Sequence, residues 1–174
     1  ELTLVCNALD HKTEVLATVL NNVKASDQPL LYGFASAWAG WIQVNSDDWN
    51  AIAQIPKIKL LFLRSLQLDE GHDHGGAHLY LGVLSSQIPP SLGGKPEAAR
   101  EHFEKALELS DGKNLMVHVL YAEHYARLMF EQELHDRLLN QALAADSDEP
   151  GLTLINTLAK KRASVLLEES SEFF

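Results

Sequence analysis

The chain has 174 residues, of which 46% are apolar and 22% are charged, a composition typical of one compact domain rather than a disordered chain. Its 24 acidic and 14 basic residues give a formal net charge of −10, which disfavours a phosphate-binding surface, because such surfaces depend on Lys and Arg. No apolar run reaches about 18 residues, so a membrane-spanning helix is excluded, and the single cysteine excludes an internal disulfide framework. We predict one helical-repeat domain over residues 1–174.

The first long helix is predicted to begin near Pro29, because Ser26 and Asp27 precede that proline as helix-start signals do. Within this helix, Trp38 and Trp41 lie three residues apart. In stacked helical hairpins the first helices line a concave surface, which makes both rings candidate ligand-binding residues. Plain core packing is the alternative interpretation, since aromatic side chains at helical spacing also fill helical cores.

Residues 69–78 are rich in His, Asp and Gly, and imidazole and carboxylate ligands suit zinc or nickel. Two adjacent glycines interrupt the helix start, however, and the other interpretation is that Asp69 caps one helix while Asp73 or His74 caps the next. We therefore predict no metal site and no cofactor. Asp69 and His74 are instead expected to border a cleft or to meet a partner.

The connection over residues 88–96 contains two prolines and two glycines, which predicts a fixed and unusual backbone path. It is either a rigid connector between helices or a loop that lies over a cleft or an interface. Its candidate functional residues are Pro89, Pro90, Gly93 and Gly94.

The second half of the chain repeats apolar residues at the helical period in four consecutive stretches. Their apolar positions are Ala99, Phe103, Ala106 and Leu107; Leu115, Val119, Ala122, Ala126 and Met129; Leu134, Leu138, Ala142 and Ala145; and Ile155, Ala159, Ala163 and Leu166. No stretch alternates with period two for long enough to indicate a strand. The sequence predicts an all-α protein.

Three segments of the chain also resemble one another, at residues 61–69, 102–110 and 138–146, with offsets of 41 and 36 residues. In each segment a large apolar residue is followed three positions later by a small one. The pairs are Phe62 and Ser65, Phe103 and Ala106, and Leu139 and Ala142. Such pairs allow close packing of hairpin helices, which predicts stacked hairpins with degenerate tetratricopeptide-like repeats. An irregular helical bundle with chance similarity is the alternative.

Three tyrosines and one asparagine complete the candidate ligand-binding set. Tyr80, Tyr121 and Tyr125 are expected on first helices of hairpins, where their rings would wall a groove and their hydroxyls would orient a ligand. Asn156 is costly inside a helix unless its amide is used, either by the backbone of a neighbouring helix or by a ligand.

Catalytic signatures are missing from the sequence, which has no nucleophile elbow, phosphate-binding glycine loop or paired-carboxylate motif. We therefore assign no catalytic residue. Arg100 and Arg162 are interpreted either as paired surface charges or as cations of a cleft.

A row of motifs between residues 68 and 167 is more specific than the repeat pattern. It comprises Asp69-Glu70, Gly75-Gly76-Ala77-His78-Leu79-Tyr80-Leu81-Gly82, Ile88-Pro89-Pro90-Ser91-Leu92-Gly93-Gly94-Lys95-Pro96, the segment 99–107 and the segment 156–167. This order resembles the TatT family, the tetratricopeptide-like T component associated with TRAP transporters. Its Gly-Gly and Pro-Pro loops are not generic features of helical repeats.

The resemblance implies a periplasmic, usually lipid-anchored helical protein that works with a soluble solute-binding protein and assembles as a homotrimer. It also implies a channel or cleft for an apolar or amphipathic ligand. The sequence lacks a matching lipidation motif, so we expect any anchor to lie outside it. Two alternatives remain: a generic tetratricopeptide-like scaffold unrelated to transport, and an enzyme with a metal at residues 72–78.

Overall fold

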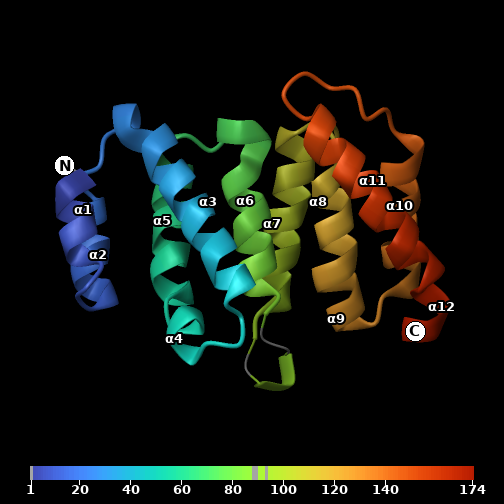
Figure 1. Cartoon of the computed structure of the whole chain (residues 1–174), viewed down its shortest axis with the longest axis horizontal. Helices are drawn as coiled ribbons and strands as arrows, with labels where there is room; N and C mark the ends of the chain where they lie inside the picture. The colour runs from blue at the N-terminus through green and yellow to red at the C-terminus, as the bar shows by residue number, and fades with distance from the viewer. Residues whose placement is uncertain (1, 88–89, 93) are drawn as a thin grey trace. The chain divides into compact units, whose positions relative to one another are not determined.

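The computed structural model describes residues 2–87, 90–92 and 94–174, and the described residues contain helices and turns but no strand. The all-α prediction is therefore confirmed. The chain divides into two compact units, residues 1–80 and 81–174, and helix α6 (His72–Ser85) runs from the first into the second (Figure 1). The prediction of one repeat domain stays a prediction.

The first unit is built around the packing of its two longest helices. Its elements are α1 (Leu2–Ala8), α2 (Thr13–Leu20), η1 (Ala25–Asp27), α3 (Gln28–Val44), α4 (Trp49–Ile52), α5 (Ile55–Leu68) and the beginning of α6. Helix α3 packs on α5, and α2 packs on the same helix (Figure 1). Pro29 lies in the first turn of α3, as predicted, because a helix start needs no amide hydrogen there. At the α3–α5 contact, buried Gln28 donates to the Ser65 hydroxyl at 2.9 Å.

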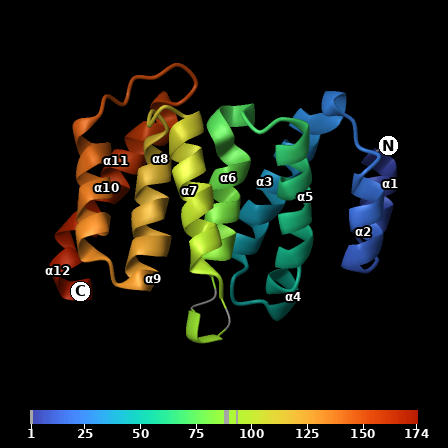
Figure 2. The same cartoon turned by 180° about the vertical axis from the view of Figure 1, so that it is seen from behind.

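The second unit is a bundle in which α10 contacts three neighbouring elements. Its elements are η2 (Pro90–Leu92), α7 (Pro96–Leu109), α8 (Leu115–Leu120), η3 (Tyr121–Ala126), α9 (Arg127–Met129), α10 (Gln132–Ala144), α11 (Thr153–Glu168) and α12 (Ser170–Phe173). Helix α10 packs on α11, α8 and η3, and α7 lies beside α8 (Figure 2). The segment η3 is a π-helical stretch that joins α8 to α9 without a break.

Gly82 explains how tightly α6 and α7 pack in the second unit. A Cβ atom at this position would lie 2.9 Å from Cε1 of the Phe103 ring, closer than side chains tolerate. The Leu-Gly dipeptide at residues 81–82 therefore lets a helix backbone approach the face of a buried ring.

The residues that define the predicted repeats are all buried. Phe62, Phe103 and Leu139 are 0% exposed, and so are the small residues Ser65, Ala106 and Ala142 that follow them. The phenylalanines also have matching partners: Phe62 stacks on Tyr80 with ring centroids 4.7 Å apart, and Phe103 stacks on Tyr121 at 5.0 Å. Both partners of the second stack lie 41 residues after those of the first. This arrangement agrees with repeated hairpins, and the repeat relationship itself stays a prediction.

Candidate functional site

The tyrosines proposed for ligand binding form parts of the aromatic cores. In the first unit, Tyr80 is half-buried, its ring stacks on Phe62 at 11° between planes, and Tyr32 meets it edge-on at 6.3 Å. In the second unit, Tyr121 and Tyr125 are 3% and 1% exposed. Burial raises the pKa of both phenols. These contacts stabilise the fold, and a ligand role for the three rings stays a prediction.

The Asn156 amide is used by the protein backbone. Its Oδ1 accepts from the amide of Leu115 at 2.9 Å, and its Nδ2 donates to the carbonyl of Lys113 at 3.0 Å. The side chain is 0% exposed and joins α11 to the beginning of α8. This is the first of the two interpretations given above, in which the asparagine bonds a neighbouring helix.

Trp38 and Trp41 belong to a continuous apolar face on the solvent side of α3. Trp41 is 47% exposed, whereas Trp38 is half-buried and contacts Phe34 at 5.6 Å between ring centroids. The exposed residues of this helix are Pro29, Leu30, Gly33, Phe34, Ala37, Gly40, Trp41, Gln43 and Val44. Helix α3 contains no charged residue. We call this surface the α3 face.

The histidine-rich segment has a conformation that the sequence did not predict. Asp73, His74 and Gly75 all have positive φ, of 50°, 54° and 77°, so they form a left-handed turn inside α6. The capping role of Asp73 or His74 stays a prediction. Asp73 accepts a hydrogen bond from the Tyr32 hydroxyl at 2.5 Å.

Gly76 is required by the same contact. A Cβ atom at this position would collide with the Tyr32 hydroxyl, so only glycine leaves room for the tyrosine that holds the turn. Burial and the Asp73 carboxylate together raise the pKa of Tyr32, which keeps its hydroxyl a donor.

The remaining loop candidates lie at exposed or partly exposed places. Asp69 ends α5, and its carboxylate accepts from the amide of Gly71 at 3.1 Å; His74 is exposed. Pro90 begins the exposed turn η2, and Gly94 follows it half-buried. Pro89 and Gly93 lie outside the described residues. Across 2–87, 90–92 and 94–174, no three His, Cys, Asp or Glu side chains gather as metal ligands would.

A second exposed apolar surface lies on α11, where sequence reasoning had found only a core stripe. Leu154, Leu158 and Val165 are 77%, 47% and 51% exposed. Between α8 and α11 is an open hollow of about 430 Å³ lined by Met116, Leu158, Lys161, Arg162 and Val165, which we call the α8–α11 groove. In the sequence, the sign of this surface was a second set of apolar residues, Leu154, Leu158 and Val165, on a helix that already had a core stripe.

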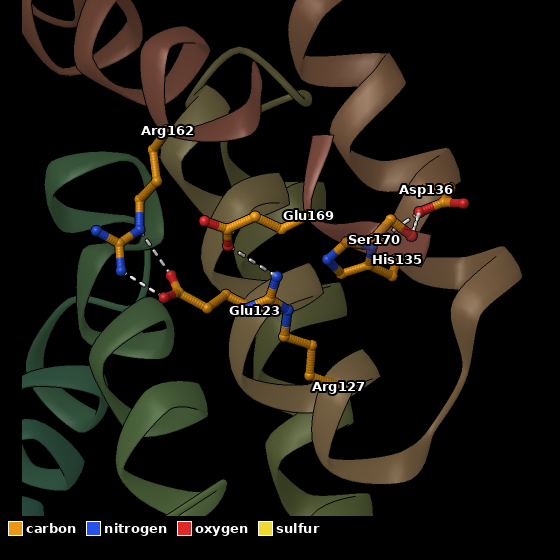
Figure 3. Close-up of polar contacts among 7 residues, drawn as sticks. All are labelled: Glu123, Arg127, His135, Asp136, Arg162, Glu169 and Ser170. Carbon is orange, nitrogen blue, oxygen red and sulfur yellow. Dashed lines mark hydrogen bonds and ion pairs between the residues drawn. The ribbon is translucent and has the colours of Figure 1, made fainter. Parts of the chain in front are cut away.

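Figure 3 shows three sets of polar contacts in the second unit, the first of which involves Arg162 of this groove. The Arg162 guanidinium donates two hydrogen bonds to the Glu123 carboxylate, one of them from Nε at 2.7 Å. Arg127 Nη2 lies 3.6 Å from a carboxylate oxygen of Glu169. The bidentate pair shows that Arg162 is a paired charge at the surface, one of the two interpretations proposed for it.

The third set of contacts fastens α12 to α10. The Ser170 hydroxyl donates to Asp136 Oδ1 at 2.6 Å, and Nδ1 of buried His135 lies 2.9 Å from the same oxygen. Partial burial acts to raise the pKa of Asp136, but the contacts with Ser170 and His135 outweigh it and lower that pKa. The carboxylate is thereby held in its charged form.

The model of one protein family, described as TRAP transporter T-component (TAtT), matches residues 2–174. The chain belongs to this family. The match extends the resemblance found between residues 68 and 167 to nearly the whole chain, including the first 60 residues, where only a helix pattern had agreed. Among curated proteins, none matches the chain significantly.

Membership of the TRAP transporter T-component family bears directly on the alternatives left open by the sequence. It supports an accessory role in TRAP transport and disfavours a scaffold unrelated to transport. In the part of the chain that the structure describes, no helix has both the length and the apolar character needed to cross a bilayer. The exposed apolar surfaces that the structure adds to the predicted candidates are the α3 face and the α8–α11 groove.

Proposed function

We propose that the chain is a non-enzymatic accessory protein of TRAP-type solute uptake that binds the solute-binding protein of its system. The family match over residues 2–174 carries this proposal. Two exposed apolar helix surfaces support it, since contiguous apolar patches on a folded protein mark sites of protein contact. The periplasmic location and the lipid anchor implied by the resemblance belong to the same proposal, and cell fractionation with an antibody tests both.

Binding to the solute-binding protein is tested by titration calorimetry with the purified partner of the same TRAP system. We expect association with a Kd on the order of tens of micromolar or tighter. The chain carries a net charge of −10, so raising the salt concentration should alter the association rate if charge steers the encounter. Absence of binding at that concentration, with and without solute, contradicts the proposal.

We further propose that a small apolar or amphipathic solute binds at the candidate rings of the first unit, Trp38, Trp41 and Tyr80. Tyr80 is only half-buried and Trp41 is 47% exposed, so both rings have exposed surface that a ligand can contact. Tyr121 is 3% exposed and stacked, and replacing it would disturb the core. A better test is Tyr80→Phe, which keeps the ring and removes the hydroxyl: ligand-induced thermal shifts should shrink in this variant. Equal shifts in both proteins would count against the tyrosine's role.

Self-association is the third part of the proposal, with the α3 face as the contact between copies. Two chains of charge −10 repel one another, and α3 is the only described helix of eight or more residues without a charged side chain. Its face alternates large residues with small ones such as Gly33 and Ala37, which allows a facing helix to interdigitate.

Sedimentation equilibrium tests this contact. Trp41→Glu, placed in the α3 face, should reduce the mass of the assembly to that of one chain, because it would bury a charge between apolar helices. Trp49→Glu is the control, since Trp49 is 85% exposed and lies on α4. An unchanged mass in the Trp41 variant, or a single-chain mass in the unaltered protein, contradicts self-association through this face.

A further inference from the structure

Helix α11 has two apolar faces, and its own unit covers one of them. The covered residues are Asn156, Ala159, Ala163 and Leu166. On the opposite side, Leu154, Leu158 and Val165 are exposed and follow one another at i, i+4 and i+11. This is the spacing with which a helix packs against another helix, so the outward face is shaped for a helical neighbour.

Lys161 lies in the middle of this outward stripe, at i+7 from Leu154. It is exposed, and it forms no hydrogen bond or ion pair with the described residues. The neighbouring cation differs, since Arg162 is paired with Glu123, which the π-helical segment η3 presents to α11 (Figure 3). Lys161 is thus the uncompensated positive charge of the α8–α11 groove, on a chain whose net charge is −10.

The charge pattern selects the kind of helix that fits. Covering the Lys161 ammonium with an apolar surface would leave a buried charge unpaired, so an occupant with a carboxylate opposite Lys161 is favoured over a wholly apolar one. A second copy related by a two-fold axis through the groove would bring two Lys161 side chains together, which is repulsive. The favoured occupant is therefore a different surface, apolar along one helical face and acidic at its centre.

We propose that the α8–α11 groove docks an amphipathic helix of the solute-binding protein, with a Glu or Asp of that helix placed against Lys161. This inference rests on the proposed function and assigns it a surface and a partner chemistry. Met116, Leu158 and Val165 supply the apolar walls, and methionine adapts its shape to the entering side chains. Glu123 keeps Arg162 beside the groove. The docked helix therefore meets one free cation, Lys161, and one paired cation, Arg162.

Calorimetry with matched variants of the chain tests the groove. Lys161→Glu should weaken binding of the solute-binding protein by about tenfold or more, because it sets two carboxylates against each other. Lys12→Glu makes the same change of net charge at an exposed site of the first unit and should weaken binding by less than about twofold. Leu158→Ala should weaken binding several-fold, whereas Leu63→Ala, at a side chain 43% exposed on α5, should not.

Carbodiimide coupling identifies the occupant directly, because it joins a lysine amine to a carboxylate in contact with it. Mass spectrometry of the coupled complex should show Lys161 joined to a Glu or Asp on a helix of the solute-binding protein. Coupling of Lys161 to a carboxylate of another copy of this chain overturns the proposed partner.

Failure of the inference and failure of the proposed function give different results. If the unaltered protein binds the solute-binding protein and Lys161→Glu binds equally well, the groove is not the docking surface and the proposed function stands. If the unaltered protein does not bind at all, the proposed function is overturned and the docking inference with it.

Discussion

The two units have similar aromatic cores and different exposed surfaces. Each stacks a fully buried phenylalanine on a tyrosine, with 11° between the ring planes in both stacks. Outside, the first unit exposes the uncharged α3 face, whereas the second exposes an apolar stripe with Lys161 at its centre. In the proposals above, one packing pattern carries two surfaces of different charge: an uncharged one assigned to contact between copies and a basic one assigned to an acidic partner.

Because the aromatic cores of the two units match, truncating the equivalent phenylalanine in each unit should lower the free energy of unfolding by a similar amount. Phe62→Ala and Phe103→Ala each leave a cavity beside a tyrosine ring, and each should lower the free energy of unfolding by about 3–5 kcal/mol. Chemical denaturation of both variants measures the effect. A large loss in one unit with a small loss in the other would break the proposed equivalence.

Gln28 and Asn156, one buried amide from each unit, allow a second comparison between the units. Asn156→Ala removes the partners of one backbone N–H and one backbone carbonyl, and should cost about 1–3 kcal/mol. Gln28→Ala removes only the donor to the Ser65 oxygen, and the Ser65 hydroxyl can still donate its own hydrogen, so the cost should be smaller. The denaturant concentrations at half-unfolding, measured at an unchanged m-value, compare the two variants. A larger loss of stability in Gln28→Ala than in Asn156→Ala would show that Asn156 is not essential to the α8–α11 connection.

Two glycines test whether helix packing or helix propensity decides stability. Gly82→Ala drives a methyl group into the Phe103 ring and should destabilise the protein by about 1–3 kcal/mol. Gly33→Ala meets no atom within 4 Å on the α3 face and should stabilise the helix by about 0.5–1 kcal/mol. Thermal unfolding of both variants gives the signs, and destabilisation by Gly33→Ala would indicate that a neighbour occupies this face.

Acid should weaken the second unit through two half-buried histidines, His118 and His124. Burial lowers the pKa of His118 and, together with Arg162, that of His124, so the folded state disfavours their protonation. The unfolded chain takes up these protons near pH 6.5, and stability should therefore fall as the pH drops below that value. The lowered pKa of Asp136 acts in a separate window, since its contribution is lost only below about pH 4.

Melting temperatures between about pH 7.5 and 5.5 measure the histidine contribution. His118→Gln should make the dependence on pH less steep, because it removes one of the two groups that take up protons on unfolding. An equally steep dependence in this variant would exclude His118 as a cause.

Much of the core could be predicted from the sequence, because helical periodicity reports directly on burial. Phe62, Phe103 and Leu139 were expected inside and are buried. The use of Asn156 by a neighbouring backbone was also among the alternatives, since an interior asparagine needs partners for its amide.

The surfaces and the strained turn were harder to predict. A second apolar set on α3 or α11 looks the same in the sequence whether another helix covers it or solvent does. The left-handed turn over residues 73–75 depends on Tyr32, which is about 40 residues distant in the chain and contributes nothing to the local pattern. Local propensity alone would have placed a simple cap there.

Hydrogen–deuterium exchange on the complex with the solute-binding protein locates the docking surface on the chain. We expect binding to slow exchange in peptides covering α8 and α11, residues 115–120 and 153–168, while peptides covering α3, residues 28–44, keep the rates they have without the partner. Slower exchange confined to α3, with α8 and α11 unaffected in a saturated complex, would contradict this expectation.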